Sequence, residues 1–144
     1  MDALVAEGVA VEAVSRVYET APREVEDQPA FLNAACRVRT ELDPSALLDL
    51  VKGIERELGR VEGPRFGPRA IDLDILMWEG GAWRDARLEV PHPRLGERRF
   101  ALVPLLDVSP DGVLADGRGP ATALASLDAD EQPVGLAPGT LARR

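Results

Sequence analysis

The chain has 144 residues, 45% of them apolar, and a formal net charge of −8 at pH 7. This length favours one domain with a real hydrophobic core, and the acidic charge argues against nucleic acid as a bulk partner. No stretch approaches the roughly 18 uninterrupted apolar residues of a membrane span. Cys36 is the only cysteine, which excludes an internal disulfide and a cysteine-based metal cluster. We therefore expect a cytoplasmic protein with no secretory signal and no membrane partner.

The first forty residues alternate between helical and extended patterns. Residues 1–7 predict the end of an amphipathic helix that closes at Gly8. Period-2 alternation predicts strands over 9–18 and 31–40, joined by a loop over 19–29. The loop has no apolar periodicity, and we expect it to be mobile. One face of the first strand would carry Val9, Val11, Ala13, Ser15 and Val17, and one face of the second Phe31, Asn33, Ala35, Arg37 and Arg39.

A long amphipathic helix is predicted next. Asp43-Pro44 supplies an N-cap followed by proline at the first helical position. Apolar residues at helical spacing extend to about Leu58, where Gly59 is expected to end the helix. Lys52 and Glu55 lie three positions apart on it, so their side chains should be neighbours.

The second half of the chain is predicted to contain one strand and several helical segments. The expected elements are a strand over 71–78, a turn over 79–81, a hairpin partner over 83–90, a fixed corner over 91–94, helical segments over 95–107, a turn over 109–112 and a short helix over 122–127. The pattern predicts an α+β or α/β fold with helices over one sheet, and of the two we favour α+β, as an α/β sandwich. A single domain would span residues 1–128, and a flexible tail 129–144.

Candidate chemistry concentrates in residues 60–78. Three arginines, the first Arg60 and the last Arg69, lie along a loop that contains two prolines. Asp72 and Asp74 follow and share one face of the predicted strand, with Cα atoms roughly 6–7 Å apart. Two carboxylates repel each other unless a cation lies between them. A divalent metal carrying a polyphosphate would satisfy both charges; alternatively, the aspartates are solvated and the arginines are only their ion-pair partners.

Other candidate ligands lie outside this cluster. His92, the only histidine, is flanked by two prolines and could donate a hydrogen bond to phosphate or be structural. Asn33 could read the edge of a heterocycle, or bond only to neighbouring backbone. Phe31 shares its predicted face, and Phe100 could cover the other side of a flat ring.

Five segments, in order, resemble the 6-hydroxymethyl-7,8-dihydropterin pyrophosphokinase family of folate biosynthesis. They are SRVYETAP (15–22), DQPAFLNAA (27–35), IERELGR (54–60), RFGPRAIDLDIL (65–76) and VPHPRLGERRFALVPLLDVSPD (90–111). The resemblance covers residues 1 to about 115. The combination of G-P-R-x-I-D-L-D-I-L with a later P-H-P-R is highly specific.

The resemblance implies a ferredoxin-like antiparallel sheet with helices packed on it. It implies transfer of pyrophosphate from ATP to the hydroxymethyl group of a reduced pterin, with AMP released. Two Mg²⁺ ions would be bound by Asp72 and Asp74, which would be catalytic together with Arg60 and Arg69. The implied ATP contacts are Glu55, Arg60, Arg69, His92 and Arg98. The implied pterin contacts are Thr20, Pro22, Phe31, Asn33 and Phe100.

The chain also departs from the family pattern. The family begins with a strand and a Gly-Ser-Asn turn, so we expect the first strand of the sheet to be missing here, through a late start codon or a truncation. Arg23, Glu24 and Glu62 are unusual at their positions. The alternative to an active enzyme is an inactive homologue, or a pterin- or nucleotide-binding module without turnover. A ferredoxin-like nucleic-acid binder is disfavoured by the charge, and the sequence leaves the oligomeric state undetermined.

Overall fold

The computed structural model describes residues 2–20, 31–62 and 73–137. The helices are α1 (Asp2–Ala6), α2 (Pro44–Glu62), the 3₁₀ helix η2 (Leu95–Glu97), α3 (Arg99–Val108) and α4 (Pro120–Ala125). The strands are β1 (Ala10–Val14), β2 (Tyr18–Thr20), β3 (Phe31–Asn33), β4 (Cys36–Arg39), β5 (Trp83–Arg84), β6 (Glu89–Val90) and β7 (Gly135–Leu136). Antiparallel strands combined with helices confirm the α+β class.

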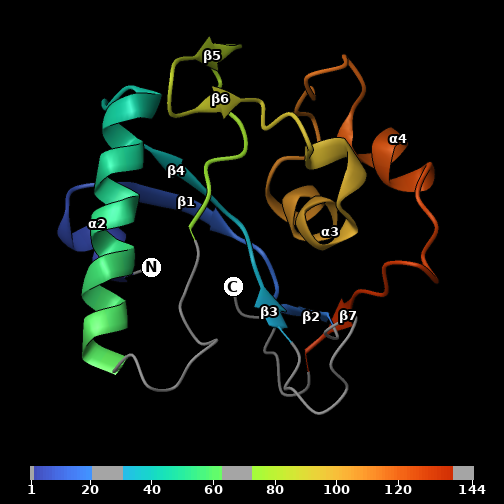
Figure 1. The fold of residues 1–144 in the computed structure, drawn as a ribbon, viewed down its shortest axis with the longest axis horizontal. Helices are drawn as coiled ribbons and strands as arrows, with labels where there is room; N and C mark the ends of the chain where they lie inside the picture. The colour runs from blue at the N-terminus through green and yellow to red at the C-terminus, as the bar shows by residue number, and fades with distance from the viewer. Residues whose placement is uncertain (1, 21–30, 63–72, 138–144) are drawn as a thin grey trace.

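Within the described residues, the strands form three small antiparallel sheets, ordered β1-β4, β3-β2-β7 and β5-β6. In Figure 1, α2 lies to the left of the β1–β4 pair, and α3 and α4 lie to its right. Helix α3 contacts both β1 and β4 and also β2 and β3, so it spans two of the sheets. None of the helices in the described ranges is long and apolar enough to cross a membrane.

The two predicted strands of the first forty residues exist, but each is divided. Strand 9–18 breaks between β1 and β2, and strand 31–40 breaks between β3 and β4. The breaks lie opposite each other, because Ser15 N–H donates to the Ala35 carbonyl and Ala35 N–H donates to Ser15 Oγ, both at 2.8 Å. A paired hairpin must bend in both arms at once, and sequence alternation alone does not show where.

This break changes which side chains of the second arm face inward. Leu32 is 66% exposed while Asn33 is half-buried, as the alternation predicts. Beyond Ala35 the pattern switches, and Cys36 is half-buried while Arg37 is exposed. The prediction of one continuous face from Phe31 to Arg39 is therefore wrong, because the irregular pair of residues between the strands shifts the alternation by one.

Helix α2 begins where the sequence predicts and ends later. The Ala46 N–H donates to Asp43 Oδ1 at 2.8 Å, which confirms the N-cap. The helix continues through Gly59 to Glu62, so Gly59 is not its C-cap. A glycine inside a helix costs only about 1 kcal/mol, which the favourable residues around it offset.

The predicted strand over 71–78 is not a strand in its described part, residues 73–78. A strand needs a neighbour for its backbone groups, and here those groups bond elsewhere. The Leu76 carbonyl accepts from the backbone N–H of His92 at 2.9 Å. The predicted hairpin partner, 83–90, is also corrected, because it folds on itself as the β5–β6 pair.

The remaining elements follow the predictions with small shifts. Gly8, with φ of 87°, ends α1, as expected of a glycine in the left-handed region. The turn after α3 closes with Gly112 N–H donating to the Ser109 carbonyl at 3.3 Å. Helix α4 starts at Pro120, two residues before the predicted helix, because proline is favoured in the first helical turn. In the predicted tail, β7 pairs with β2, while residues 138–144 lie outside the described ranges.

The main core lies between α3, α4 and the inner side of the hairpin. Leu95, Leu102 and Ala123 are nearly inaccessible to solvent, at 1%, 0% and 0% exposure. The other buried members of the cluster are Leu105, Val108 and Leu114. Leu76 and Met77 of the irregular segment pack against it, so the core fixes the position of the residues that follow Asp74.

A polar cluster ties the hairpin to the end of α3. Tyr18 Oη donates to Asp107 Oδ2 at 2.7 Å, and Arg16 Nη2 donates to Asp107 Oδ1 at 3.3 Å. Burial alone would raise the pKa of Asp107, but the hydrogen bonds from Tyr18 and Arg16 outweigh it and lower that pKa. The ionised carboxylate is therefore the form that the fold stabilises.

Tyr18→Phe should lower the free energy of unfolding by about 1–2 kcal/mol at pH 7, because it removes a hydrogen bond to a charged group. Urea unfolding measures the change. Since the pKa of Asp107 is lower in the folded state, its stabilising effect is present above the unfolded pKa and disappears as the pH falls through the folded pKa. The penalty of Tyr18→Phe should shrink over the same range.

An Asp107→Ala background provides the control for this prediction. Tyr18→Phe should cost little there, because its partner is already gone. An equal penalty in both backgrounds would contradict the assignment of the stabilising contact to this pair.

Candidate functional site

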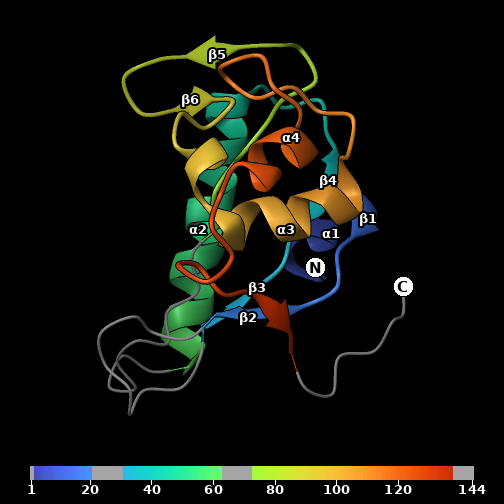
Figure 2. The same cartoon turned by 90° about the vertical axis from the view of Figure 1, so that its right-hand side faces the viewer.

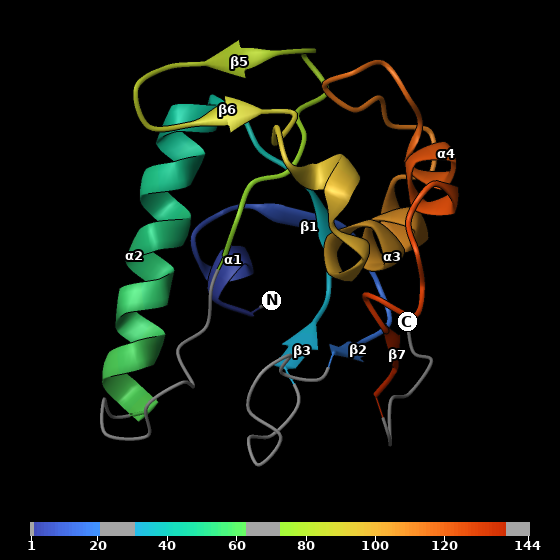
Figure 3. The same cartoon turned by 45° about the vertical axis from the view of Figure 1, so that its right-hand side comes forward.

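A pocket of about 430 Å³ lies between α2, the start of the irregular segment, the β5–β6 hairpin and the corner after β6. Figure 3 shows the hairpin lying over the N-terminal end of α2. The pocket brings Asp74 and His92 together, two residues that the sequence analysis proposed for metal and ATP. Its lining residues are Leu48, Lys52, Asp74, Ile75, Asp85, Ala86, Arg87, Leu88, Glu89, His92 and Pro93.

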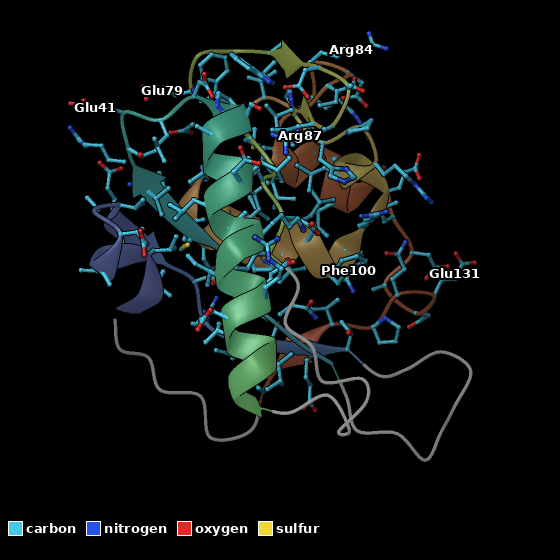
Figure 4. All side chains as sticks on the ribbon, turned by 60° about the vertical axis from the view of Figure 1, so that its left-hand side comes forward. Glu41, Glu79, Arg84, Arg87, Phe100 and Glu131 are labelled. Carbon is cyan, nitrogen blue, oxygen red and sulfur yellow. The ribbon has the colours of Figure 1, made fainter. Side chains whose placement is uncertain are left out.

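Arg87 links α2 to the β5–β6 hairpin, which forms one wall of the pocket. Its guanidinium donates to Asp49 Oδ1 at 2.7 Å and to Ser45 Oγ at 2.8 Å, and Figure 4 shows it beside the helix. Asp85 shapes the turn beneath it, accepting from the backbone N–H groups of Arg87 and Leu88 at 2.8 and 2.9 Å. Neither residue was predicted from the sequence. The only local signal for this turn was the position of Asp85, two and three residues before the N–H groups of Arg87 and Leu88.

Helix α2 also holds the chain directly before Asp74. Lys52 Nζ donates to Glu55 Oε2 and to the Leu73 carbonyl, both at 3.1 Å. Leu73 N–H in turn donates to Glu55 Oε2. Both backbone groups of Leu73 are thus bonded by side chains of one helix, in place of a neighbouring strand. The predicted proximity of Lys52 and Glu55 is confirmed, and Lys52 is a pocket residue that the sequence analysis did not propose.

Asp74 presents an accessible carboxylate to this pocket. Its side chain is 57% exposed, and Lys52 Nζ lies 3.9 Å from Oδ1, a loose ion pair. Within the described residues there is no group of three or more acidic, histidine or cysteine side chains that could hold a metal alone. Magnesium commonly takes one or two carboxylates and completes its shell with water and phosphate oxygens. The exposure and the loose pairing of Asp74 suit that kind of site.

His92 is held by its backbone and by one ring nitrogen. Its N–H donates to the Leu76 carbonyl at 2.9 Å, and its Nδ1 accepts from the Arg94 N–H at 3.2 Å. Because Nδ1 is the acceptor, the proton of the neutral ring lies on Nε2. The neutral ring therefore has an N–H donor at Nε2, which takes no part in the contact with the Arg94 backbone.

The surroundings of His92 lower its pKa. Burial is the largest cause, and the positive charges of Arg98 and Arg94 act in the same direction. The carboxylates of Asp74 and Glu89 act against it and raise the pKa. The net effect is to lower the pKa of His92, so the neutral form predominates at pH 7.

Of the residues implied for the pterin, those that the structure describes lie on β2, on β3 and at the start of α3. Asn33 Nδ2 donates to Thr20 Oγ1 at 3.3 Å across the two strands. Phe100 is 40% exposed in the first turn of α3, and the Arg98 guanidinium lies 5.7 Å from the centre of its ring. Helix α3 contacts both strands, so these residues belong to neighbouring elements.

Several predicted site residues lie outside the description. They are Pro22, Arg69 and Asp72, together with the side chains of Phe31 and Arg60. Their roles stay predictions. Of the described residues, Asp74 and His92 line the pocket, Glu55 adjoins it through Lys52, and Arg98 acts electrostatically on His92.

Comparison with known proteins identifies the family to which the chain is similar. A profile of the family described as 7,8-dihydro-6-hydroxymethylpterin-pyrophosphokinase (HPPK) matches residues 1–110. The chain is 47% identical over 121 residues to a Methylorubrum extorquens protein named 2-amino-4-hydroxy-6-hydroxymethyldihydropteridine pyrophosphokinase, covering 84% of this chain and 76% of that protein. A Bacillus subtilis protein of the same name is 48% identical over 100 residues, covering 69% of this chain and 60% of that protein.

A third relative is much longer. The mitochondrial folate synthesis bifunctional protein of Arabidopsis thaliana is 50% identical over 101 residues, covering 70% of this chain and only 18% of the plant protein. The matched part of this chain thus spans less than two thirds of the length of both the plant and the Bacillus relatives. The profile nevertheless covers well over half of this sequence, and the chain belongs to the HPPK family.

Proposed function

We propose that this protein transfers pyrophosphate from ATP to 6-hydroxymethyl-7,8-dihydropterin, giving AMP and the pterin diphosphate in folate biosynthesis. Family membership and the names of the Methylorubrum and Bacillus relatives support this activity. The observation that carries it is the pocket in which Asp74, His92 and Lys52 meet. We also propose the ferredoxin-like arrangement of the family for the sheet and a cytoplasmic location, although the Arabidopsis relative is named as mitochondrial.

The pocket between α2 and the β5–β6 hairpin is the proposed ATP site. Its volume of about 430 Å³ lies in the usual range for small-molecule pockets, roughly 300–1,000 Å³. Lys52 supplies an ammonium group at its wall, and Leu48, Ile75 and Leu88 supply apolar surface. The proposed contacts from Glu55, Arg60, Arg69 and Arg98 would surround it.

The reaction needs charge neutralisation more than covalent help. The hydroxymethyl oxygen attacks the β-phosphorus, the bond to the oxygen bridging the α- and β-phosphates breaks, and AMP leaves. The hydroxyl proton passes to solvent as the new bond forms. Cationic groups that face the phosphates stabilise the charge that develops on their oxygens.

His92 fits a role as a neutral donor to a phosphate oxygen. Its Nδ1 is used by the Arg94 N–H, and its lowered pKa keeps the ring neutral at pH 7. The Nε2–H can then donate without a change of protonation state. The ring therefore orients a phosphate and need not transfer a proton.

Asp74, together with Asp72, would hold the two Mg²⁺ ions that the family resemblance implies. When bound, magnesium neutralises the negative charge of the triphosphate. The accessible carboxylate of Asp74 and its loose pairing with Lys52 support the assignment. Lys52 limits the repulsion between this carboxylate and the phosphates before the metal is present.

The pterin site is proposed on the β2–β3 hairpin and the first turn of α3. A side-chain amide has two N–H donors and a carbonyl acceptor, and within the described residues the Asn33 side chain makes one hydrogen bond, to Thr20. The remaining groups suit the donor and acceptor edge of a pterin ring. The exposed face of Phe100 offers stacking, with Pro22 and Phe31 as further proposed contacts.

The activity is tested by measuring AMP release from ATP with and without the pterin and Mg²⁺. Release that requires both supports the proposal. Calorimetric binding of the pterin, or of a non-hydrolysable ATP analogue, without AMP release would instead identify a binding module or an inactive homologue.

Asp74→Asn should abolish most of the Mg²⁺-dependent turnover. Removing a metal-binding carboxylate forfeits several kcal/mol of transition-state stabilisation, about a hundredfold or more in kcat. The melting temperature should change little, because the side chain is largely exposed. Asp111→Asn, an exposed aspartate in the turn after α3, is the control. Full activity in Asp74→Asn would rule out the metal role.

Asn33→Ala should raise KM for the pterin by about fivefold or more while KM for ATP stays near the wild-type value, since about 1 kcal/mol of hydrogen bonding is lost on one substrate only. Steady-state kinetics with each substrate varied in turn measure both constants. Leu32→Ala, a 66% exposed neighbour on the opposite face, is the matched control. Equal losses for both substrates would mean that the pterin pocket lies elsewhere.

The pKa of His92 should move in opposite directions in two variants. Arg98→Gln should raise it, because a nearby positive charge is removed, and Asp74→Asn should lower it, because a negative charge is removed. Proton NMR of the imidazole follows the titration, and the signal is unambiguous because the chain has one histidine. Shifts of the same sign in both variants would contradict the arrangement around His92.

A further inference from the structure

Gln132 lies in the loop between α4 and β7, outside the residues matched by the family profile. Its side-chain amide bonds the backbone on both sides of Arg98. Nε2 donates to the Glu97 carbonyl at 3.1 Å, and Oε1 accepts from the Arg99 N–H at 2.8 Å. The Gln132 carbonyl also accepts from Arg99 Nη1 at 2.6 Å. Gln132, which lies near the C-terminus, therefore holds the start of α3 in place through three hydrogen bonds.

The hydrogen bonds of Gln132 resemble those of a neighbouring strand. Arg98 is extended, with φ of −123° and ψ of 101°. In an extended residue, the preceding carbonyl and the following N–H point to the same side, so one amide can bond both. The other backbone groups of Arg98 are bonded within the chain around it, N–H to Leu95 at 3.1 Å and carbonyl from Leu102 N–H at 2.9 Å.

Gln132 also takes the place of a helix cap. The first N–H groups of a helix have no partner inside the helix, and a side chain usually supplies one. Arg98, at the N-cap position of α3, makes no such side-chain bond. The Gln132 oxygen satisfies the Arg99 N–H instead. The start of α3, which carries Arg98 and Phe100, is thus closed by a distant residue.

The loop that carries Gln132 is anchored at its far end. Gly135 and Leu136 of β7 pair with Glu19 and Tyr18 of β2, and Ala137 N–H donates to the Val17 carbonyl at 3.0 Å. Figure 2 shows β7 beside β2, below α3. The segment from Gln132 to Ala137 thereby connects the start of α3 with the β2–β3 hairpin, which carries Asn33. The hydrogen bonds of Gln132 are therefore supported at both ends of this segment.

We propose that Gln132 is a positioning residue that fixes Arg98 for its contact with ATP. The inference rests on the proposed function, because Arg98 is a proposed ATP contact. The Arg98 guanidinium lies over the Phe100 ring, and its positive charge lowers the pKa of His92. Fixing the backbone at Arg98 sets where this long side chain starts, and so limits the positions that the guanidinium can reach.

The test compares Gln132→Ala with Glu131→Ala, an exposed neighbour at the edge of the molecule in Figure 4, and places each in the wild-type and Arg98→Gln backgrounds. Gln132→Ala should raise KM for ATP about fivefold, with a smaller change in kcat and in KM for the pterin. It should also raise the pKa of His92 toward its value in Arg98→Gln. In the Arg98→Gln background it should add no further change to either quantity.

A second variant separates positioning from capping. Gln132→Glu keeps an acceptor for the Arg99 N–H but replaces the donor to the Glu97 carbonyl with a carboxylate. It should reproduce most of the loss in ATP affinity. Wild-type ATP affinity in Gln132→Glu would mean that only the cap matters, and would overturn the proposal. Equal effects of Gln132→Ala in both Arg98 backgrounds, or equal effects of Glu131→Ala, would also overturn it.

Two readouts keep this inference separate from the proposed function. The His92 titration and calorimetric binding of a non-hydrolysable ATP analogue need no turnover. Absence of AMP release by the wild-type chain would count against the activity, whereas the coupling between Gln132 and Arg98 would still appear or fail in the titration. AMP release with no such coupling would leave the activity in place and reject the role of Gln132.

Discussion

The hold of α2 on Leu73 is the constraint on which the candidate site depends. Leu73 has no strand beside it in the described residues, and its two backbone groups would be left without partners if Lys52 and Glu55 did not bond them. Unpaired backbone groups are costly once they are partly buried, so this contact fixes the irregular segment against the helix. The next residue is Asp74, and its carboxylate reaches the pocket because the segment is held there.

The proposed function requires an acidic protein to bind an anionic substrate. A net charge of −8 would repel ATP at long range, but screening in physiological salt reduces such repulsion beyond roughly 8 Å. Within the pocket, Lys52 lies beside Asp74, and His92 is kept neutral by burial and by nearby arginines. Local arrangement of these groups, and not the overall charge, decides which ligand fits.

Residues 132–137, near the C-terminus, contact the rest of the fold more than their composition indicates. A stretch rich in glycine, proline and charge predicts a flexible tail, yet β7 pairs with β2 and Gln132 bonds the start of α3. The contacts are made by the backbone of β7 and by the side-chain amide of Gln132. Neither kind of contact requires a hydrophobic pattern in the sequence. Local composition cannot report a partner that lies more than thirty residues away.

The sequence by itself determined the features that depend on neighbours along the chain. They are the Asp43 cap of α2, the close of α1 at Gly8, the turn that ends at Gly112, and the motif residues that identify the family. Tertiary structure alone decided the features that depend on distant partners. The paired break at Ser15 and Ala35, the loss of strand structure over 73–78, and the pocket wall made by Arg87 all arise from hydrogen bonds between separate elements. Such bonds depend on the position of the partner in space, which no local pattern records.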